Sequence, residues 1–536
     1  MVITHAVDCS VAYSQEMGRN EAGEKPKDLV LTVPSFATQH ERLALMAAGS
    51  LVDLNVLMLM EENTAAAVQY ATDKTFSEED GGSQLLLLYN LGASSLQVSI
   101  VKFESIEHKA SKLSKAKPAP CVTVVAKAWD DTLGGQAFDN LIVEHLADQF
   151  NHQWNAKTKS KNKDVRTVPR AMTKLRIQAN KIKHVLSANM EIPVYMESLH
   201  DDVTLQSHMT RKELEELAHK SGLLKRAIAP VAAVFEAANL TAADLTGPKV
   251  ELIGAGMRVP SVQSALQDYF GDAATLGFHM NADESSAMGA AFAGANISTA
   301  FRVRHIGLTD LNPFPMTISL SNLATEEKGN KKKKKKKGDD EEEWSKKATI
   351  FKAMGKFGIK KTLAFTHDKD VFCEVDYDDV AEDADPSLSL PQGTEKTLER
   401  YNVTGIAAFA AEMEEKGLGK PKVSLQFELS TSGIAQLVKA EATVQETYMA
   451  NVTEEIEVDD EDETDEEENA TDTKEGEDEA GKDENKDSET VDDKDEAAAN
   501  DTEASNDTVK VEDIKKKAKK KKTIVVEKVR FLFFSC

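Results

Sequence analysis

The chain has 536 residues, of which 41% are hydrophobic, so it is long enough to form two or three domains with cores of their own. Its 91 acidic and 65 basic side chains leave a net charge of −26, which argues against nucleic-acid binding because a phosphate backbone would be repelled. No run of about 18 apolar residues is present, so no membrane-spanning helix is expected. Four cysteines without metal-ligand spacing are predicted to be free or buried thiols: Cys9, Cys121, Cys373 and Cys536.

The first part of the chain has the pattern of an α/β domain. From Leu29 to Thr299, short apolar runs alternate with amphipathic segments, as strands and helices do in that class. Residues 1–17 precede this pattern and lack the basic start and apolar core of a signal peptide.

A β-hairpin is predicted between Leu85 and Phe103. Four consecutive leucines, 85–88, indicate a buried strand, and apolar residues then alternate with mostly polar ones from Leu96 onward. The turn between the two strands, Asn90–Ser95, is small and polar, which lets backbone N–H groups approach a phosphate. For this stretch alone, an ordinary hairpin turn is the alternative.

Two later stretches also place small residues where a strand meets a helix. In the first, the strand Val250–Ile253 leads into Gly254-Ala255-Gly256, and Pro260 then begins an amphipathic helix. In the second, Asp283 and Glu284 precede a helix rich in small residues, at an end that favours negative charge. Three such junctions together predict a nucleotide site, although tight strand–helix packing remains an alternative for the glycines.

Two helices are predicted between these junctions. Residues 171–189 carry apolar side chains at three- and four-residue spacing, which indicates one buried face. Lys183 and Ser187 are four residues apart and share another face. Thr210 and Glu213 form a capping box at the start of a long helix that is expected to run toward Asn239.

The character of the sequence changes after Phe301. Predicted strands are TLAFTH, VFCEVDY, YNVTGIAAF and KVSLQFEL, so residues 301–450 have the composition of a small β-sandwich. A lysine run beside an acidic block predicts a solvated charged loop over residues 326–347, with a nuclear-localisation signal as the less favoured alternative. Residues 451–510 are almost entirely polar and acidic and are expected to be a disordered insertion, after which residues 511–536 begin a further strand.

Several motifs, in this order along the chain, resemble the heat-shock protein 70 superfamily, whose ATPase domain has the actin-like fold. YNLGASSLQVSIV resembles its second phosphate loop, LIGAGMRVP its adenosine motif, and WDDTLGGQAFDNLIVEHL its GG-x-x-FD segment. TVPSFATQHERLALMAAG and EENTAAAVQYATD resemble its connecting segments. Within the superfamily, the residues of these motifs and the acidic insertion are most similar to those of the large endoplasmic-reticulum members.

This resemblance implies an actin-like ATPase domain over residues 1–300, followed by a β-sandwich domain over residues 301–450 that clamps extended hydrophobic segments. It also implies that the chain begins inside the first lobe of the ATPase domain, without the first phosphate hairpin and its lysine. The chain would end before the family's helical lid and before any K-D-E-L retrieval signal. The sequence is therefore expected to be a fragment, with a genuinely shortened product as the less favoured alternative.

The resemblance further implies a site for ATP or ADP, accompanied by Mg²⁺, with no residue assigned as a metal ligand. The predicted nucleotide-binding residues are Gly92, Ala93, Ser94, Gly134, Gly135, Lys183, Ser187, Gly254, Ala255, Arg258 and Asp283. Without the resemblance, Lys183 and Ser187 would be interpreted as a solvated lysine and a surface serine. Asn180 and His184 stand where the family usually has glutamate and arginine, which weakens the adenosine prediction.

The catalytic carboxylates of active family members have counterparts here that are amides. Their phosphate loop reads D-L-G-G-G-T-F-D, whereas this chain has Asn90 and Gln97 at the two acidic positions. An amide cannot lend negative charge to Mg²⁺ or accept a proton, so ATP hydrolysis is expected to be weak or absent. Glu62 is the one carboxylate retained in these motifs and is the candidate catalytic residue.

These features predict a chaperone that binds nucleotide, holds unfolded client polypeptides and serves as nucleotide-exchange partner of a conventional lumenal heat-shock protein 70 chaperone. The alternative is a foldase driven by its own ATP turnover, whereas a sugar kinase of the same fold would not explain the β-rich region. The endoplasmic-reticulum lumen is the expected location, with the cytoplasm as the alternative. Weak support comes from N-x-[ST] sequons at Asn239, Asn296, Asn402, Asn451, Asn469, Asn500 and Asn506.

Overall fold

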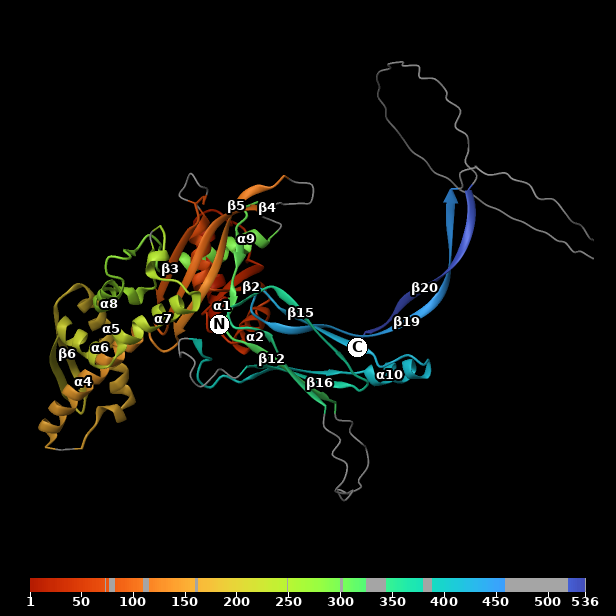
Figure 1. The fold of residues 1–536 in the computed structure, drawn as a ribbon. Coiled ribbons are helices and arrows are strands. Elements are labelled where there is room, and N and C mark those ends of the chain that lie inside the picture. Colours follow the sequence, from red (N-terminus) through yellow and green to blue (C-terminus); the bar gives the residue numbers. More distant parts are fainter. Residues whose placement is uncertain are drawn as a thin grey trace, which may run out of the picture. The chain divides into compact units, whose positions relative to one another are not determined.

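The computed structural model of the protein describes residues 1–72, 74–76, 82–108, 115–159, 162–247, 249–298, 302–323, 344–378, 388–457 and 519–535 (Figure 1). They form two compact units, Met1–Val444 with Leu532–Cys536, and Gln445–Phe531. The second unit contains the end of strand β19 (Ala435–Glu457) and most of strand β20 (Lys519–Ser535). The first unit contains every other element.

A six-stranded mixed sheet organises the α/β part of the first unit, with the order β10-β5-β4-β3-β8-β9. Its strands are β3 (Gln84–Leu91), β4 (Leu96–His108), β5 (Lys117–Asp130), β8 (Val250–Ile253), β9 (Leu276–Gly277) and β10 (Gly307–Thr309). Strands β3, β4 and β5 are antiparallel neighbours, whereas β8 pairs in parallel with β3 and β10 in parallel with β5. The hairpin predicted from the sequence is therefore confirmed as β3 and β4.

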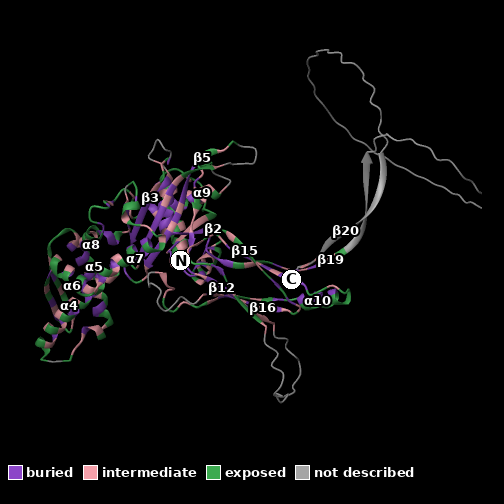
Figure 2. Cartoon of the chain, viewed as in Figure 1, coloured by how far each residue is buried: buried purple, intermediate pink, exposed green. Residues whose placement is uncertain are grey.

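Helices cover both faces of this sheet. Leu87 and Tyr89 share a core with α7 (Leu223–Ala238) and α8 (Pro260–Phe270). Leu86 and Leu88 share another core with α3 (Glu62–Thr72) and α9 (Ser285–Ile297). Successive side chains of a strand point to opposite faces, so the two cores lie on opposite sides of β3, whose centre is buried (Figure 2). The α/β prediction is confirmed.

The remaining elements of this part form smaller groups. Strand β1 (Asp28–Val33) pairs in parallel with β2 (Asn55–Glu61), and β6 (Glu191–His200) pairs antiparallel with β7 (Val203–Thr210). The other helices are α1 (Val2–Glu16), α2 (Gln39–Ser50), α4 (Gly135–Thr158), α5 (Pro169–Ala188) and α6 (Arg211–Lys220). Helix α5 buries the apolar face that its spacing predicts, against α4, β6 and β7.

The prediction of one continuous helix from Thr210 toward Asn239 is wrong. The capping box at Thr210 and Glu213 is present, but α6 ends at Lys220 and α7 begins at Leu223. Gly222 lies between them with φ = 77°. A glycine in this left-handed conformation ends a helix at little steric cost, so the chain turns there.

The strands that follow β10 form mainly two four-stranded sheets that contribute to one hydrophobic core. The first has the order β13-β12-β16-β17 and the second β15-β18-β19-β20. The strands not yet defined are β11 (Leu311–Asn312), β12 (Met316–Asn322), β13 (Ser345–Phe351), β14 (Gly355–Lys356), β15 (Ile359–Thr366), β16 (Val371–Tyr377), β17 (Thr397–Val403) and β18 (Lys422–Leu429). In β18, alternate residues from Val423 to Leu429 enter the core, as the sequence predicts.

Two details of this region differ from the sequence prediction. The stretch YNVTGIAAF is not one strand, because β17 ends at Val403 and helix α10 (Ile406–Glu415) begins after Gly405, whose φ is 91°. Strand β10 falls within the residues predicted to be β-rich but joins the six-stranded sheet through β5. A strand of three residues carries no pattern that would indicate this distant partner.

Several predictions fall partly or wholly on undescribed positions. The charged loop expected at 326–347 lies outside the described residues up to position 343, and its last three residues belong to β13. The acidic insertion expected at 451–510 lies outside them from position 458, and residues before that belong to β19. Cys9, Cys121 and Cys373 are free thiols, whereas Cys536 is not described. None of the described helices is long and apolar enough to cross a membrane.

Candidate functional site

The turn of the β3–β4 hairpin packs directly on the start of α4. The N–H of Gly92 donates to the carbonyl of Ser95 at 2.9 Å and closes the turn. The N–H groups of Gly135 and Gln136 donate to the carbonyls of Gly92 and Ala93 at 3.0 and 2.8 Å. Two predicted phosphate-binding segments are therefore brought together by backbone hydrogen bonds.

Small residues make this contact possible and leave backbone donors available. A Cβ at Gly134 would collide with the backbone of Ala93 and Ser94, so only glycine fits there. Ala93 and Ser94 are exposed, and their N–H groups make no hydrogen bond within the described residues. Adjacent free N–H groups in a turn are suited to binding an anion such as a phosphate.

The third predicted segment, Gly254–Gly256, packs on the same hairpin from the side of β8. Gly254 has φ = 82°, and a Cβ there would collide with the carbonyl of Leu91 and approach Oδ1 of Asn90. A Cβ at Gly256 would collide with Leu91 as well. The glycines do serve tight packing, as the alternative interpretation holds, and the same packing fixes the position of Asn90.

Lys183 is a buried lysine, in contrast to the solvated lysine that the sequence alone suggests. Its Nζ donates to the carbonyl of Gly135 at 2.9 Å and forms an ion pair with Asp139, also at 2.9 Å. Asn180 donates to the same carboxylate at 3.0 Å, while the hydroxyl of Ser187 donates to the carbonyl of Lys183. The contacts of Lys183 and Asn180 hold α5 against the start of α4, beside the hairpin turn, whereas that of Ser187 lies within α5.

Arg258 and Asp283 form an exposed ion pair of 3.1 Å. Arg258 ends the 3₁₀ turn Ala255–Arg258, and Asp283 lies just before α9. Each side chain is more than half exposed, at 62% and 59%, so both remain accessible to a ligand. The structure thus pairs the two residues that the adenosine prediction names on this side.

Glu62 lies at the start of α3 and is held by Asn90 and Gln97, the two amides predicted from the sequence to stand at carboxylate positions. Its Oε2 accepts from Nε2 of Gln97 at 2.7 Å and, in a longer contact, from Nδ2 of Asn90 at 3.5 Å. The Oε1 of Gln97 accepts from the backbone N–H of Ser35 at 2.7 Å. Gln97 and Asn90 are only 1% and 6% exposed. We call these three side chains, Glu62, Asn90 and Gln97, the amide cluster.

The amide cluster does not suit Mg²⁺. This ion requires six oxygen ligands at about 2.0–2.1 Å, commonly including one or two carboxylates. The cluster offers a single carboxylate, and both amides direct their N–H groups toward it. Among the described residues, no group of three or more histidine, cysteine or acidic side chains could hold a metal ion. No step of the mechanism is therefore assigned to a metal at this site.

A second polar cluster, which the sequence motifs do not indicate, surrounds the preceding residue, Glu61. Nζ of Lys127 lies 2.7 Å from both oxygens of Glu61 and 3.2 Å from Asp310, while Arg42 lies 3.1 Å from Glu61. Burial, and then the charge of Asp310, raise the pKa of Glu61, against the opposing effect of Lys127 and Arg42. We call these four residues the ion cluster. A charged residue inside the apolar run of β5, VVAKAW, is the signal that could have indicated it.

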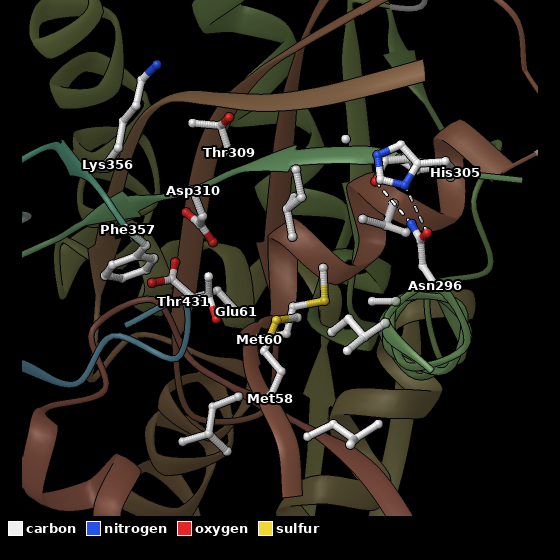
Figure 3. A pocket seen from close by; sticks show the side chains of 18 of the residues that line it. Met58, Met60, Glu61, Asn296, His305, Thr309, Asp310, Lys356, Phe357 and Thr431 are labelled. Atoms are coloured by element: carbon white, nitrogen blue, oxygen red, sulfur yellow. Dashed lines mark hydrogen bonds between the residues drawn. The ribbon is translucent and has the colours of Figure 1, made fainter. Parts of the chain in front are cut away.

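A cavity of about 630 Å³ adjoins the ion cluster. Its floor is largely apolar and includes Met58 and Met60 of β2. Figure 3 shows Asp310 and Phe357 at one end and His305, hydrogen-bonded to Asn296, at the other. Residues of the α/β part and of the β-rich part both line the cavity, and none of the predicted site residues does.

Comparison with known proteins identifies the class to which this fold and this arrangement of glycine turns belong. The family model described as Hsp70 protein matches residues 12–341, which is more than half of the chain. The chain belongs to the Hsp70 family, and the resemblance predicted from its motifs is confirmed.

Curated relatives make this membership more specific. The chain is 32% identical over 446 residues to heat shock 70 kDa protein 17 of Arabidopsis thaliana, covering 82% of this chain and 47% of the relative. It is 30% identical over 435 residues to hypoxia up-regulated protein 1 of Xenopus tropicalis, covering 81% and 63%, respectively. For hypoxia up-regulated protein 1 of Mus musculus the identity is 31% over 447 residues, covering 83% and 42%. The chain thus spans roughly half the length of the curated relatives it matches.

Proposed function

We propose that this chain is part of a chaperone that binds ADP or ATP and holds unfolded polypeptides. The observation that carries the proposal is the convergence of three glycine turns, around Gly92, Gly134 and Gly254, on the tip of one hairpin. Free backbone N–H groups at Ala93 and Ser94 would bind phosphate oxygens there.

The adenosine would lie between two sets of side chains that flank this hairpin. Lys183 and Ser187 are provided by α5, and Ala255, Arg258 and Asp283 by the segments before α8 and α9. Lys183 would remain paired with Asp139 and orient the start of α4, whereas the exposed guanidinium of Arg258 would contact the ligand.

Hydrolysis is proposed to be weak or absent. Glu62 is the remaining candidate for activating water, but its Oε2 accepts hydrogen bonds from Gln97 and Asn90. A carboxylate that is occupied by two donors is a poor general base. The chaperone would then act by nucleotide-dependent binding, without its own catalytic turnover.

The β-rich region is proposed to bind the client. The two four-stranded sheets contribute to a single core, and all their strands except β20 and the end of β19 lie within residues 301–450, so these residues are proposed as a β-sandwich domain and residues 1–300 as the ATPase domain. Extended hydrophobic segments are the client chemistry such a domain would accept, through main-chain hydrogen bonds and apolar pockets. A partner role in nucleotide exchange for a conventional lumenal heat-shock protein 70, and an endoplasmic-reticulum location, are proposed from the likeness to hypoxia up-regulated protein 1.

Equilibrium titration of the full chain with ADP tests the nucleotide site. Arg258→Ala should weaken ADP binding by about three- to tenfold, because one charged contact contributes about 1 kcal/mol. Arg176→Ala, which removes an exposed arginine of α5, is the matched control and should leave the affinity unchanged. If the wild-type chain binds no ADP, or if both variants behave alike, the site is misplaced.

Client holding and catalysis are tested separately on the same chain. Suppression of aggregation of an unfolded client, and faster ADP release from a conventional Hsp70 partner, are the expected activities. If neither activity is observed, the chaperone proposal has no support. Robust phosphate release from ATP would instead favour the alternative of a self-sufficient foldase.

A further inference from the structure

We propose that the amide cluster takes the place of a bound metal, so that this chain binds its nucleotide as the free anion, without Mg²⁺. The inference rests on the proposed nucleotide site and concerns the chemical form of its ligand. It starts from the single carboxylate of the cluster, Glu62. The hydrogen bonds from Gln97 and Asn90 satisfy this carboxylate, which would otherwise be the group to attract a cation.

The orientation of Gln97 is determined by its neighbours. Its Nε2 faces the Glu62 carboxylate and its Oε1 faces the N–H of Ser35, each at 2.7 Å. Rotation of the amide by half a turn would place an oxygen against the carboxylate and an NH₂ group against an N–H. Both contacts would be repulsive, so the Oε1 of Gln97 is held toward Ser35 and away from the Glu62 carboxylate.

Asn90 is restricted in the same way. Its Nδ2 is directed toward Glu62, and its Oδ1 lies against Gly254, where an added Cβ would come within 2.8 Å of it. The one side-chain oxygen through which Asn90 could bind a metal therefore lies beside the glycine turn and is directed away from Glu62. Neither amide is a metal ligand in this arrangement.

Other carboxylates near the hairpin have basic partners. Asp139 is paired with Lys183 and Asp283 with Arg258, at 2.9 and 3.1 Å. Asp130, at the end of β5, is paired with Arg226 at 2.7 Å. The carboxylates of Asp139 and Asp130 are therefore already engaged, and that of Asp283, although exposed, has its charge balanced by Arg258.

The remaining polar groups described beside the amide cluster are neutral: hydroxyls, and the amide of Asn63, which donates to the carbonyl of Gln97 at 3.3 Å and whose Oδ1 has no hydrogen-bond partner among the described residues. Ser35 and Ser285 are each 1% exposed, and their Oγ atoms have no hydrogen-bond partner among the described residues. Ser35 contacts Gln97 through its N–H, and Ser286, next to Ser285, donates to the carbonyl of Glu62. Unpaired hydroxyls can donate to phosphate oxygens or to water, and they add no charge that would select a metal complex.

The first test is ADP binding by the full wild-type chain in excess Mg²⁺ and in excess EDTA. The expected dissociation constants agree within about twofold, a difference of less than 1 kcal/mol. A loss of affinity of about tenfold or more in EDTA would overturn the inference while supporting the nucleotide site. If ADP binds in neither buffer, the proposed function fails. Binding of metal to the nucleotide-free chain then tests separately whether the amide cluster takes the place of a metal.

Gln97→Glu supplies the second carboxylate while keeping an acceptor for the N–H of Ser35. Two carboxylates about 3 Å apart repel each other unless a cation or a shared proton lies between them. Mg²⁺ without nucleotide should therefore raise the thermal unfolding midpoint of Gln97→Glu and leave that of the wild type unchanged. Gln97→Met removes the amide without adding charge, and as the matched control it should show no response to Mg²⁺.

Binding of Mn²⁺ to the wild-type chain, followed by electron paramagnetic resonance, decides the case if Gln97→Glu does not fold. No specific site is expected at sub-millimolar Mn²⁺. One saturable site on the wild type that is absent from Glu62→Gln would overturn the inference, as would a rise in the wild-type unfolding midpoint on adding Mg²⁺.

Discussion

Glu61 and Glu62 are adjacent in the sequence, and each is the centre of a polar cluster of opposite character. Glu61 ends β2 and is held by the cations Lys127 and Arg42. Glu62 begins α3 and is held by the amides Gln97 and Asn90. The same residue type is thus stabilised by charge on one side of the strand–helix junction and by neutral hydrogen bonds on the other.

The difference separates a cluster of four buried or nearly buried charged side chains from one that contains a single charge and lies at the proposed nucleotide site. In the ion cluster, two cations balance two carboxylates, and Asp310 connects it to the segment directly after β10. Removing one partner would leave a buried charge unbalanced, which is costly. In the amide cluster, Glu62 is the only charged member, so its contacts can change with less effect on stability.

The largest effect on stability is expected from Lys127→Met. It leaves Glu61 and Asp310 with Arg42 as their one remaining cation in the ion cluster, so the free energy of unfolding should fall by about 3–5 kcal/mol. Urea unfolding followed by fluorescence measures this loss of free energy. Lys181→Met, at an exposed position of α5, is the control and should stay within about 0.5 kcal/mol. A loss below about 1 kcal/mol for Lys127→Met would contradict the structural role assigned to the ion cluster.

Gly254→Ala should lower the free energy of unfolding by about 2–3 kcal/mol and disturb the amide cluster, because the positive φ of Gly254 and a steric clash of the new Cβ both destabilise the folded state. The new Cβ would displace Asn90 and weaken ADP binding. Gly271→Ala is a matched control, since Gly271 also has a positive φ of 53° but no atom within 4 Å of an added Cβ. Its cost should be about 1 kcal/mol, with unchanged ADP affinity. Equal effects of the two substitutions in urea unfolding and ADP titration would mean that the close approach is unimportant.

Asp310→Asn should cost about 1–2 kcal/mol, because its one amide oxygen can accept from Lys127 or from Thr64 but not from both, and the residue no longer balances the lysine charge. Hydrogen exchange should become faster at the amides of β10, Gly307–Thr309. Asp368→Asn breaks an exposed ion pair with Lys420 and should change stability by less than about 0.5 kcal/mol. Unchanged exchange in β10 would show that Asp310 does not secure this strand.

The smallest effect on stability is expected from the protonation of His305, which lies at the opposite end of the cavity from Asp310. Burial, and then His108, lower the pKa of His305 below its usual value. The folded state therefore favours the neutral ring, and its contribution to stability is complete above about pH 6.5 and is lost as the pH falls through the lowered value. His305→Phe keeps a ring for stacking on His108 and should remove this part of the pH dependence of urea unfolding. If the wild type and His305→Phe show the same dependence of stability on pH, His305 does not make this contribution.

Local features of the sequence were sufficient for much of the α/β part. The leucine run of β3, the capping box at Thr210 and the apolar face of α5 are encoded by residues within one or two turns of each other. The motifs also named glycines that the structure gathers at one hairpin. Such signals survive in a single sequence because they depend on neighbours along the chain.

Tertiary structure alone decided the features that join distant positions. Lys183 is buried because Asp139, 44 residues away, pairs with it, and β10 enters the six-stranded sheet because it pairs with β5. The ion cluster likewise joins β2, β5 and the segment after β10. The sequence by itself determined the family, the main elements and the glycine turns, since these depend on local pattern and steric limits. The opposite surroundings of Glu61 and Glu62 came only from packing, because burial and charge balance depend on groups that meet after the chain has folded.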